Sequence, residues 1–329
     1  MGLAPAASAQ SIEWHAFGIA SYTFNVNQPN SGVNALRVFD SDHRVWRPQL
    51  VSLSVGRRAS PLGFQVDVVS GDDVPVMASL GAWDPTVADF TQAFLAWRPG
   101  MGSVELRAGK FYTTAGYEVI PTWDNPNLTH SRSFLFGYAI PFTHTGVRAI
   151  RTRGAFTFIG GVNRGWDKWE DNNGAVSLEA SLSFARPTFS LTFDTHHGPE
   201  LLTRSVDRRL YDFVAVIKPD SGWTLGFNAD YGTEGSTSWY GGAGYVSYAV
   251  APAWTTSLRL EQFKDTDGFR TGDVQTLSDV DLAIDWRATR GVLVRFDTRY
   301  DRSTAAVFEK RAQPSRHQAT AALVFVLTH

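Results

Sequence analysis

Apolar and polar residues alternate with a period of two over many long segments of this chain. Clear examples are 177–184, 189–194 and 223–231, where Leu, Phe, Trp, Ala and Tyr alternate with Ser, Thr, Asn, Gly and acidic residues. In a strand, this period places the apolar side chains on one face and the polar ones on the other. A strand that spans a bilayer needs about 9–11 tilted residues, and many of the segments are long enough. The pattern therefore predicts strands with one lipid-facing and one polar face.

The connections between these segments alternate between short and long. Short connections are expected at 57–62, 98–103, 152–154, 185–187, 219–222, 249–252 and 288–291. Long polar loops are expected near 26–46, 71–89, 112–143, 163–174, 196–208, 232–238, 264–274 and 301–315. These fifteen connections join sixteen strands. An even number of antiparallel strands, with tight turns at one end and long loops at the other, is typical of a bacterial outer-membrane barrel.

Composition excludes several other classes of protein. The 29 Gly and 13% aromatic residues favour strands and turns over helices, and no run of 18 apolar residues could form a transmembrane helix. A net charge of −2 and the lack of a basic block argue against nucleic acid as a partner. A soluble propeller would repeat a motif every 40 to 50 residues or so, and none recurs. The chain is predicted to be all-β and to enter a membrane as strands.

The segment 109–174 interrupts the alternation and is rich in specific motifs. It contains G-K-F, G-x-E, N-x-N, S-R-S, P-F-x-H-T-G and N-x-G-W-D followed by D-N-N, and R-x-E-x-F-x-D-x-x-G follows at 259–268. Together these motifs resemble the signature region of the β-barrel porin family related to OmpL. Two departures are Arg164, which separates Asn163 from G-W-D, and the non-aromatic C-terminal His329. The resemblance implies a channel in the outer membrane of a Gram-negative bacterium.

The long loop 112–143 is predicted to fold into the lumen, because a sixteen-stranded barrel otherwise leaves a wide aqueous channel. The alternative is an external lid over the mouth of the barrel. The candidates for the constriction or the lumen wall are Arg107, Glu118, Asp124, Arg132, Arg148, Arg259, Glu261, Asp279, Asp281, Arg295, Asp297 and Arg299. These charges either sort solutes or pair structurally across strands. If the strands flanking 288–291 form a hairpin, Asp279 should lie near Arg299, and Asp281 diagonally near Arg295 and Arg299.

No enzymatic or metal chemistry is predicted. The four residues His130, His144, His196 and His197 lack the helical spacing of a zinc protease, and the chain has no Cys and no G-x-S-x-G motif. Acidic groups near 72–73 and 167–171 have oxygen ligands that could bind Ca²⁺, but solvated loop acids explain them more simply. We therefore expect no catalytic residues, no metal and no cofactor.

Residues 1–10 are interpreted as the remnant of a signal peptide, because Ala7-Ser8-Ala9 has the small residues of a cleavage site. Residues 11–329 are predicted to form a single transmembrane barrel. Its expected partners are outer-membrane lipids and small hydrophilic solutes or ions, which would cross by passive diffusion. A homo-oligomer is left open. The alternative function is a non-conducting barrel with a structural or adhesive role, or a hydrolase.

Overall fold

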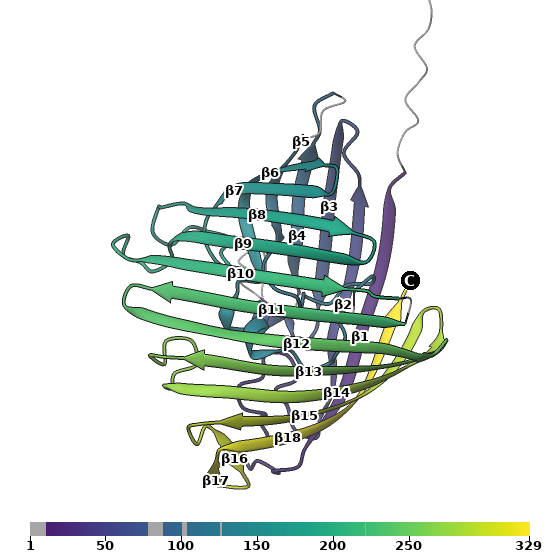
Figure 1. Cartoon of the computed structure of the whole chain (residues 1–329), viewed down its shortest axis with the longest axis vertical. Helices are drawn as coiled ribbons and strands as arrows, with labels where there is room; N and C mark the ends of the chain where they lie inside the picture. The colour runs from purple at the N-terminus through teal and green to yellow at the C-terminus, as the bar shows by residue number, and fades with distance from the viewer. Residues whose placement is uncertain (1–10, 78–87, 101–103, 126, 221) are drawn as a thin grey trace, which may run out of the picture.

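The computed structural model describes residues 11–77, 88–100, 104–125, 127–220 and 222–329. The interpreted signal remnant at 1–10 lies outside the described residues. The strands form one closed antiparallel barrel, and the end of the last strand lies beside the first (Figure 1). The predicted all-β barrel is therefore confirmed.

The barrel has sixteen strands, as predicted. In chain order, they are β1 Glu13–Asn25, β2 Trp46–Arg57, β3 Leu62–Ser70, β4 Ala88–Trp97, β5 Val104–Tyr112, β6 Thr143–Arg153, β7 Phe156–Asn163, β8 Ser177–Arg186, β9 Phe189–Pro199, β10 Asp207–Ile217, β11 Trp223–Glu234, β12 Thr237–Ala251, β13 Trp254–Asp265, β14 Gln275–Thr289, β15 Val292–Ser303 and β18 His317–Thr328. Two short strands, β16 Phe308–Lys310 and β17 Gln313–Ser315, form a separate hairpin within the last long loop. Each barrel strand pairs with the next barrel strand along the chain. This includes β15 and β18, although the β16–β17 hairpin lies between them in the sequence. Pairing of β1 with β18 leaves the barrel without an open edge.

The predicted alternation of faces is clear along β9. Phe189, Leu191 and Phe193 are exposed on the outer surface, whereas Asp194 and His196 are buried inside. Successive side chains of a strand point to opposite faces. The pairing register of β9 therefore determines which of its residues face lipid along the whole strand. No helix among the described residues is long and apolar enough to cross a membrane.

One predicted loop is a tight turn instead. The region 232–238 was expected to be a long loop, but β11 continues to Glu234 and β12 begins at Thr237. Gly235 adopts a positive φ of 58°, which a residue without a Cβ reaches at little cost and which allows the chain to reverse quickly. The prediction was wrong because glycine and polar residues are common to tight turns and long loops.

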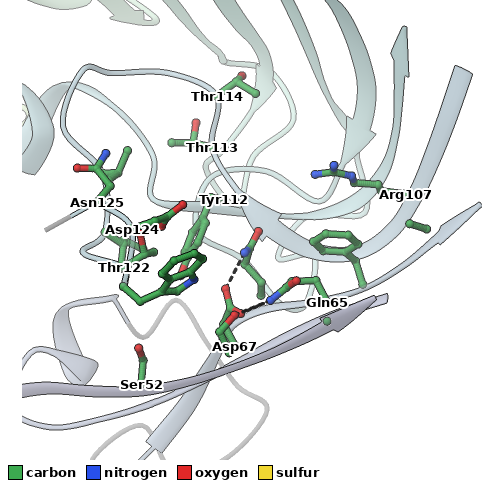
Figure 2. A pocket seen from close by; sticks show the side chains of 18 of the residues that line it. Ser52, Gln65, Asp67, Arg107, Tyr112, Thr113, Thr114, Thr122, Asp124 and Asn125 are labelled. Atoms are coloured by element: carbon green, nitrogen blue, oxygen red, sulfur yellow. Dashed lines mark hydrogen bonds between the residues drawn. The ribbon is translucent and has the colours of Figure 1, made fainter. Parts of the chain in front are cut away.

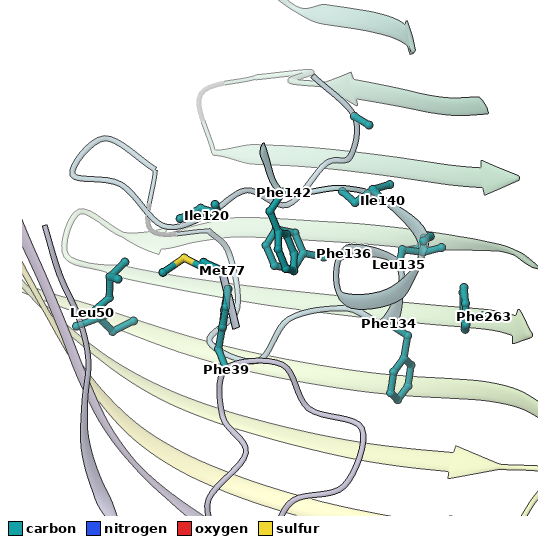
Figure 3. Close-up of a cluster of buried hydrophobic side chains, with 14 of the residues drawn as sticks. Phe39, Leu50, Met77, Ile120, Phe134, Leu135, Phe136, Ile140, Phe142 and Phe263 are labelled. Atoms are coloured by element: carbon teal, nitrogen blue, oxygen red, sulfur yellow. The ribbon is translucent and has the colours of Figure 1, made fainter. Parts of the chain in front are cut away.

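Three segments between strands contribute apolar side chains to a buried core inside the barrel. Phe39 follows β1, Met77 ends the short helix α1 Val74–Met77, and the loop after β5 contributes Phe136 and Phe142 (Figure 3). The rings of Phe39 and Phe136 lie 5.7 Å apart, and those of Phe136 and Phe142 lie 5.0 Å apart. This loop also contains the π-helical turn η1 Leu135–Ala139. The prediction that the long loop folds into the lumen is confirmed.

Candidate functional site

Arg259 is the main attachment point between the lumen wall and the loop that joins β5 to β6, residues 113–142, here called the inner loop. Its guanidinium is fully buried and lies 2.9 Å from Glu118 Oε1 in the loop. It also lies 2.9 Å from Asp279 and 3.1 Å from Asp281 on β14. A buried charge is tolerated only where it is paired and hydrogen-bonded, and Arg259 meets both conditions. Glu118 is thereby fixed to the wall.

Wall carboxylates also hold the backbone of the inner loop. Glu261 accepts hydrogen bonds from the amides of Phe134 and Leu135 at 2.8 and 2.6 Å. Asp297 accepts one from the amide of His130 at 2.6 Å. Several acidic residues of the wall therefore position the loop instead of facing open water.

Asp212 and Asn228 extend this attachment to a neighbouring part of the wall. Asp212 accepts from the amide of Gly116, and the Asn228 side-chain oxygen accepts from the amide of Tyr117, both at 3.1 Å. Neither wall residue was predicted. The period of two in the sequence does place both residues on the inward face of their strands. It does not distinguish them from the other polar residues that face the lumen.

The predicted charge ladder on β14 and β15 is present, with one change of partner. Arg299 lies 3.0 Å from Asp279, as expected, and both side chains are buried. Asp281 lies directly opposite Arg299 in the register but forms its ion pair with Arg259 on β13. Arg295 pairs at 2.6 Å with Asp285, which is directly opposite to it. Direct cross-strand neighbours therefore replace the expected diagonal pair of Asp281 and Arg295.

Arg148 and Arg132 are buried as well. Arg148 forms two hydrogen bonds to the Glu179 carboxylate, at 2.7 and 2.8 Å. Arg132 donates to the carbonyl of Thr129 within the inner loop at 2.8 Å. A direct role of these buried charges in a constriction stays a prediction.

A cavity of about 850 Å³ lies between the inner loop and the wall formed by β1 to β5 (Figure 2). Arg107, Glu118 and Asp124 are the predicted candidates that line it. Arg107 is about one-third exposed and pairs with Glu105 at 2.7 Å, while Asp124 is exposed and accepts from Thr122 at 2.7 Å. Lining residues with charged or polar side chains that the sequence did not single out include Glu13, His15, Arg57, Arg58, Gln65, Asp67, Gln92, Arg98 and Glu105.

The tip of the inner loop crosses the cavity to the first strand. Trp123 stacks on His15 with the ring centroids 3.6 Å apart and the planes 12° from parallel. On the wall nearby, the Asp67 carboxylate accepts from the side-chain amide of Gln92 at 2.6 Å. The cavity thus has an aromatic contact on one side and a hydrogen-bonded polar wall on the other.

His130 adds no charge to the buried cluster. Burial lowers the pKa of its imidazole to about 3, although the nearby Asp40 carboxylate acts in the opposite direction. The ring is therefore neutral near pH 7, and only its backbone amide takes part in holding the loop.

The sequence motifs map onto the attachments of the inner loop. Lys110 of G-K-F pairs with Asp89 at 3.0 Å on the inner wall. Asp167 of the G-W-D motif accepts from the amides of Phe142 and Thr143, where the loop rejoins the wall. Trp166 lies under the guanidinium of Arg208 at 4.8 Å. The motif residues thus fix where the loop leaves and re-enters the sheet.

Solved structures of outer-membrane proteins share this fold over nearly their whole length. An anion-selective porin from Comamonas acidovorans superposes with a TM-score of 0.68 at 10% identity, covering 97% of this chain and 100% of that one. OprB of Pseudomonas putida superposes with a TM-score of 0.66 at 11% identity, covering 97% of this chain and 94% of that one. The outer-membrane channel DcaP of Acinetobacter baumannii superposes with a TM-score of 0.64 at 8% identity, covering 98% of this chain and 99% of that one. At these identities the likeness establishes the fold.

No curated protein matches the sequence of this chain. The family model described as "Putative beta-barrel porin-2, OmpL-like" matches residues 12–328, which is nearly the whole chain. The protein therefore belongs to this family and is a β-barrel porin of the bacterial outer membrane.

Proposed function

We propose that small hydrophilic solutes diffuse through this porin along one side of the lumen, between the inner loop and β1 to β5. The observation that carries the proposal is the asymmetry of the interior. On the side of β13 to β15, the loop is bound to the wall through the buried Arg259 cluster. On the side of β1 to β5, a cavity of about 850 Å³ remains. The side of β13 to β15 then supports the inner loop, and the side of β1 to β5 provides the path for solutes.

The lining of the cavity suits polar solutes of either charge. Arg57, Arg58 and Arg107 face the same space as Glu13 and Asp124. Fixed charges in a channel with low-dielectric walls bias the entry of ions, but opposed signs partly cancel this bias. Moderate selectivity is therefore expected. We assign no catalytic reaction to the barrel, in keeping with its porin family.

Planar-bilayer recordings and liposome swelling with solutes of graded size test this function. The expected result is stepwise current and a permeation rate that falls as the solute grows. A correctly folded barrel that gives no current and no swelling would instead support the alternative of a non-conducting, structural or adhesive protein.

Replacing Asp124 with Asn should shift the reversal potential toward anions. The Asp124 carboxylate is exposed and lines the cavity, so its removal weakens the attraction for cations. The shift should be clear at about 0.1 M salt and much smaller at 1 M, where the Debye length is only about 3 Å. Asp220→Asn, in an exposed short turn, is the matched control and should leave selectivity unchanged. If both variants behave like the wild type, Asp124 does not lie on the path.

Replacing Trp123 with Ala should raise the single-channel conductance. The Trp123 ring projects from the loop tip onto His15 across the cavity, so its removal widens the space there. Trp97→Ala is the control, because this ring is exposed near the end of β4 and is absent from the cavity lining. Equal conductance in the wild type and the Trp123 variant would place the limiting section elsewhere.

A further inference from the structure

We propose that His144, Glu179 and His196 form a binding site for one divalent first-row transition-metal ion, with Zn²⁺ as its representative. The three residues lie on β6, β8 and β9 and are all buried on the inner side of the barrel. Among the described residues, they are the group of His and acidic side chains whose ligand atoms come within 4.8 Å of one another. The site is separate from the cavity described above, because none of the three lines it.

Strand register brings the ligands together. Glu179 and His196 are directly opposite each other on adjacent strands. The ring of His144 stacks on that of His196, with centroids 4.7 Å apart and planes 11° from parallel. Around a tetrahedral zinc ion with bonds of about 2.0–2.1 Å, two ligand atoms are roughly 3.4 Å apart. Because the lone pair of an imidazole nitrogen lies in the ring plane, binding requires the two nearly parallel rings to rotate toward each other.

His144 has the protonation pattern that a metal ligand needs. His144 Nδ1 lies 3.2 Å from the carbonyl oxygen of Gly165, which can only accept a hydrogen bond. The proton is therefore on Nδ1, and Nε2 presents its lone pair to the site. Such a bond to the second nitrogen is the usual way in which a metal-bound histidine is oriented.

Three buried nitrogen atoms of the site have no hydrogen-bond partner among the described residues. They are His144 Nε2 and both ring nitrogens of His196. The two side chains are only 1% and 2% exposed, so bulk water does not satisfy them. Buried polar groups are nearly always paired, and an unpaired one calls for a specific explanation. A bound metal ion would use the lone pairs that face the site.

The third ligand is held in place by its own surroundings. Arg148 donates one hydrogen bond to each oxygen of Glu179, and each oxygen keeps a further lone pair. Gly161 lies between Arg148 and Glu179 in the sheet, and a Cβ there would lie 2.2 Å from Glu179 Oε1. The strand between them therefore leaves room for the carboxylate. The positive charge of Arg148 opposes a cation, which favours moderate rather than very tight binding.

The donor set indicates the class of metal. Two imidazoles and one carboxylate suit zinc, cobalt, nickel and copper, whereas magnesium and calcium prefer oxygen ligands alone. Three protein ligands also leave a fourth position for water or a small solute.

Cobalt titration of the full chain tests the site directly. The protein, folded in detergent micelles without a polyhistidine tag and treated with a chelator, is titrated with Co²⁺ while visible absorption is recorded. One equivalent should give the intense bands of four- or five-coordinate cobalt, and Zn²⁺ should remove them. His144→Ala and His196→Ala should each weaken binding by at least about tenfold.

His197→Ala is the matched control, because this neighbouring side chain is about half exposed and lies next to Asp207 instead. It should bind Co²⁺ like the wild type, and heat-modified electrophoretic mobility verifies that each variant is folded. His196→Asn provides a second variant if the alanine variant does not fold, since the His196 side chain forms no hydrogen bond to any residue that the structure describes. The proposal is overturned if the wild type gives no bands, if the folded His196 variants bind equally well, or if His197→Ala weakens binding as much.

Discussion

Replacing Arg259 with Met is expected to release the inner loop from the wall and to give the largest change in both stability and conductance. Arg259 is fully buried between Glu118 of the loop and Asp279 and Asp281 of the wall. Removal of one partner from a buried ion pair costs about 3–5 kcal/mol, because the remaining charges are left uncompensated. The free energy of unfolding should fall by about this amount in a urea titration.

The same variant should conduct more current and flicker between levels. Without Arg259, Glu118 loses its contact with β13, and the loop that fills this side of the barrel is held less firmly. Arg302→Met is the matched control, because Arg302 is exposed near the end of β15. An Arg259 variant with unchanged stability and single steady conductance would show that this cluster does not hold the loop.

Replacing Phe193 with Arg is expected to destabilise the barrel by about 2–4 kcal/mol, the cost of a charge facing lipid near the bilayer midplane. Phe193 is exposed on the outer surface near the middle of β9, between Leu182 and Phe213 on the adjacent strands. Leu191 lies two positions earlier on the same outward face of β9, and its Arg variant should also cost about 2–4 kcal/mol if that position is near the midplane.

Thr192→Arg is the control for the direction of the side chain. Thr192 faces inward and lies 3.1 Å from the hydroxyl of Ser183, where a long cation can reach water in the lumen. Folding into lipid vesicles in urea measures all three variants. Similar costs at positions 192 and 193 would contradict the assignment of the lipid-facing side.

Much of the barrel could be predicted from the sequence, because its determinants are local. The period of two along 189–194 depends only on neighbouring residues, and it specified the outer face of β9 correctly. Turn residues marked most connections and gave the number of strands. Where the local signal was shared by two structures, as near Gly235, the prediction was wrong. The interruption at 112–143 marked the segment that fills the interior.

Tertiary structure alone decided which charges are buried and which side of the interior is open. Arg259 and Arg107 both occupy inward-facing strand positions, yet one is covered by the inner loop and the other lines a cavity. His144, Glu179 and His196 show no motif spacing in the sequence, since they come from three strands and converge only through strand register. Periodicity fixes the face of a strand on which a residue lies. The depth of that residue and its partner across the lumen depend on barrel closure and on the path of a loop held by distant charges.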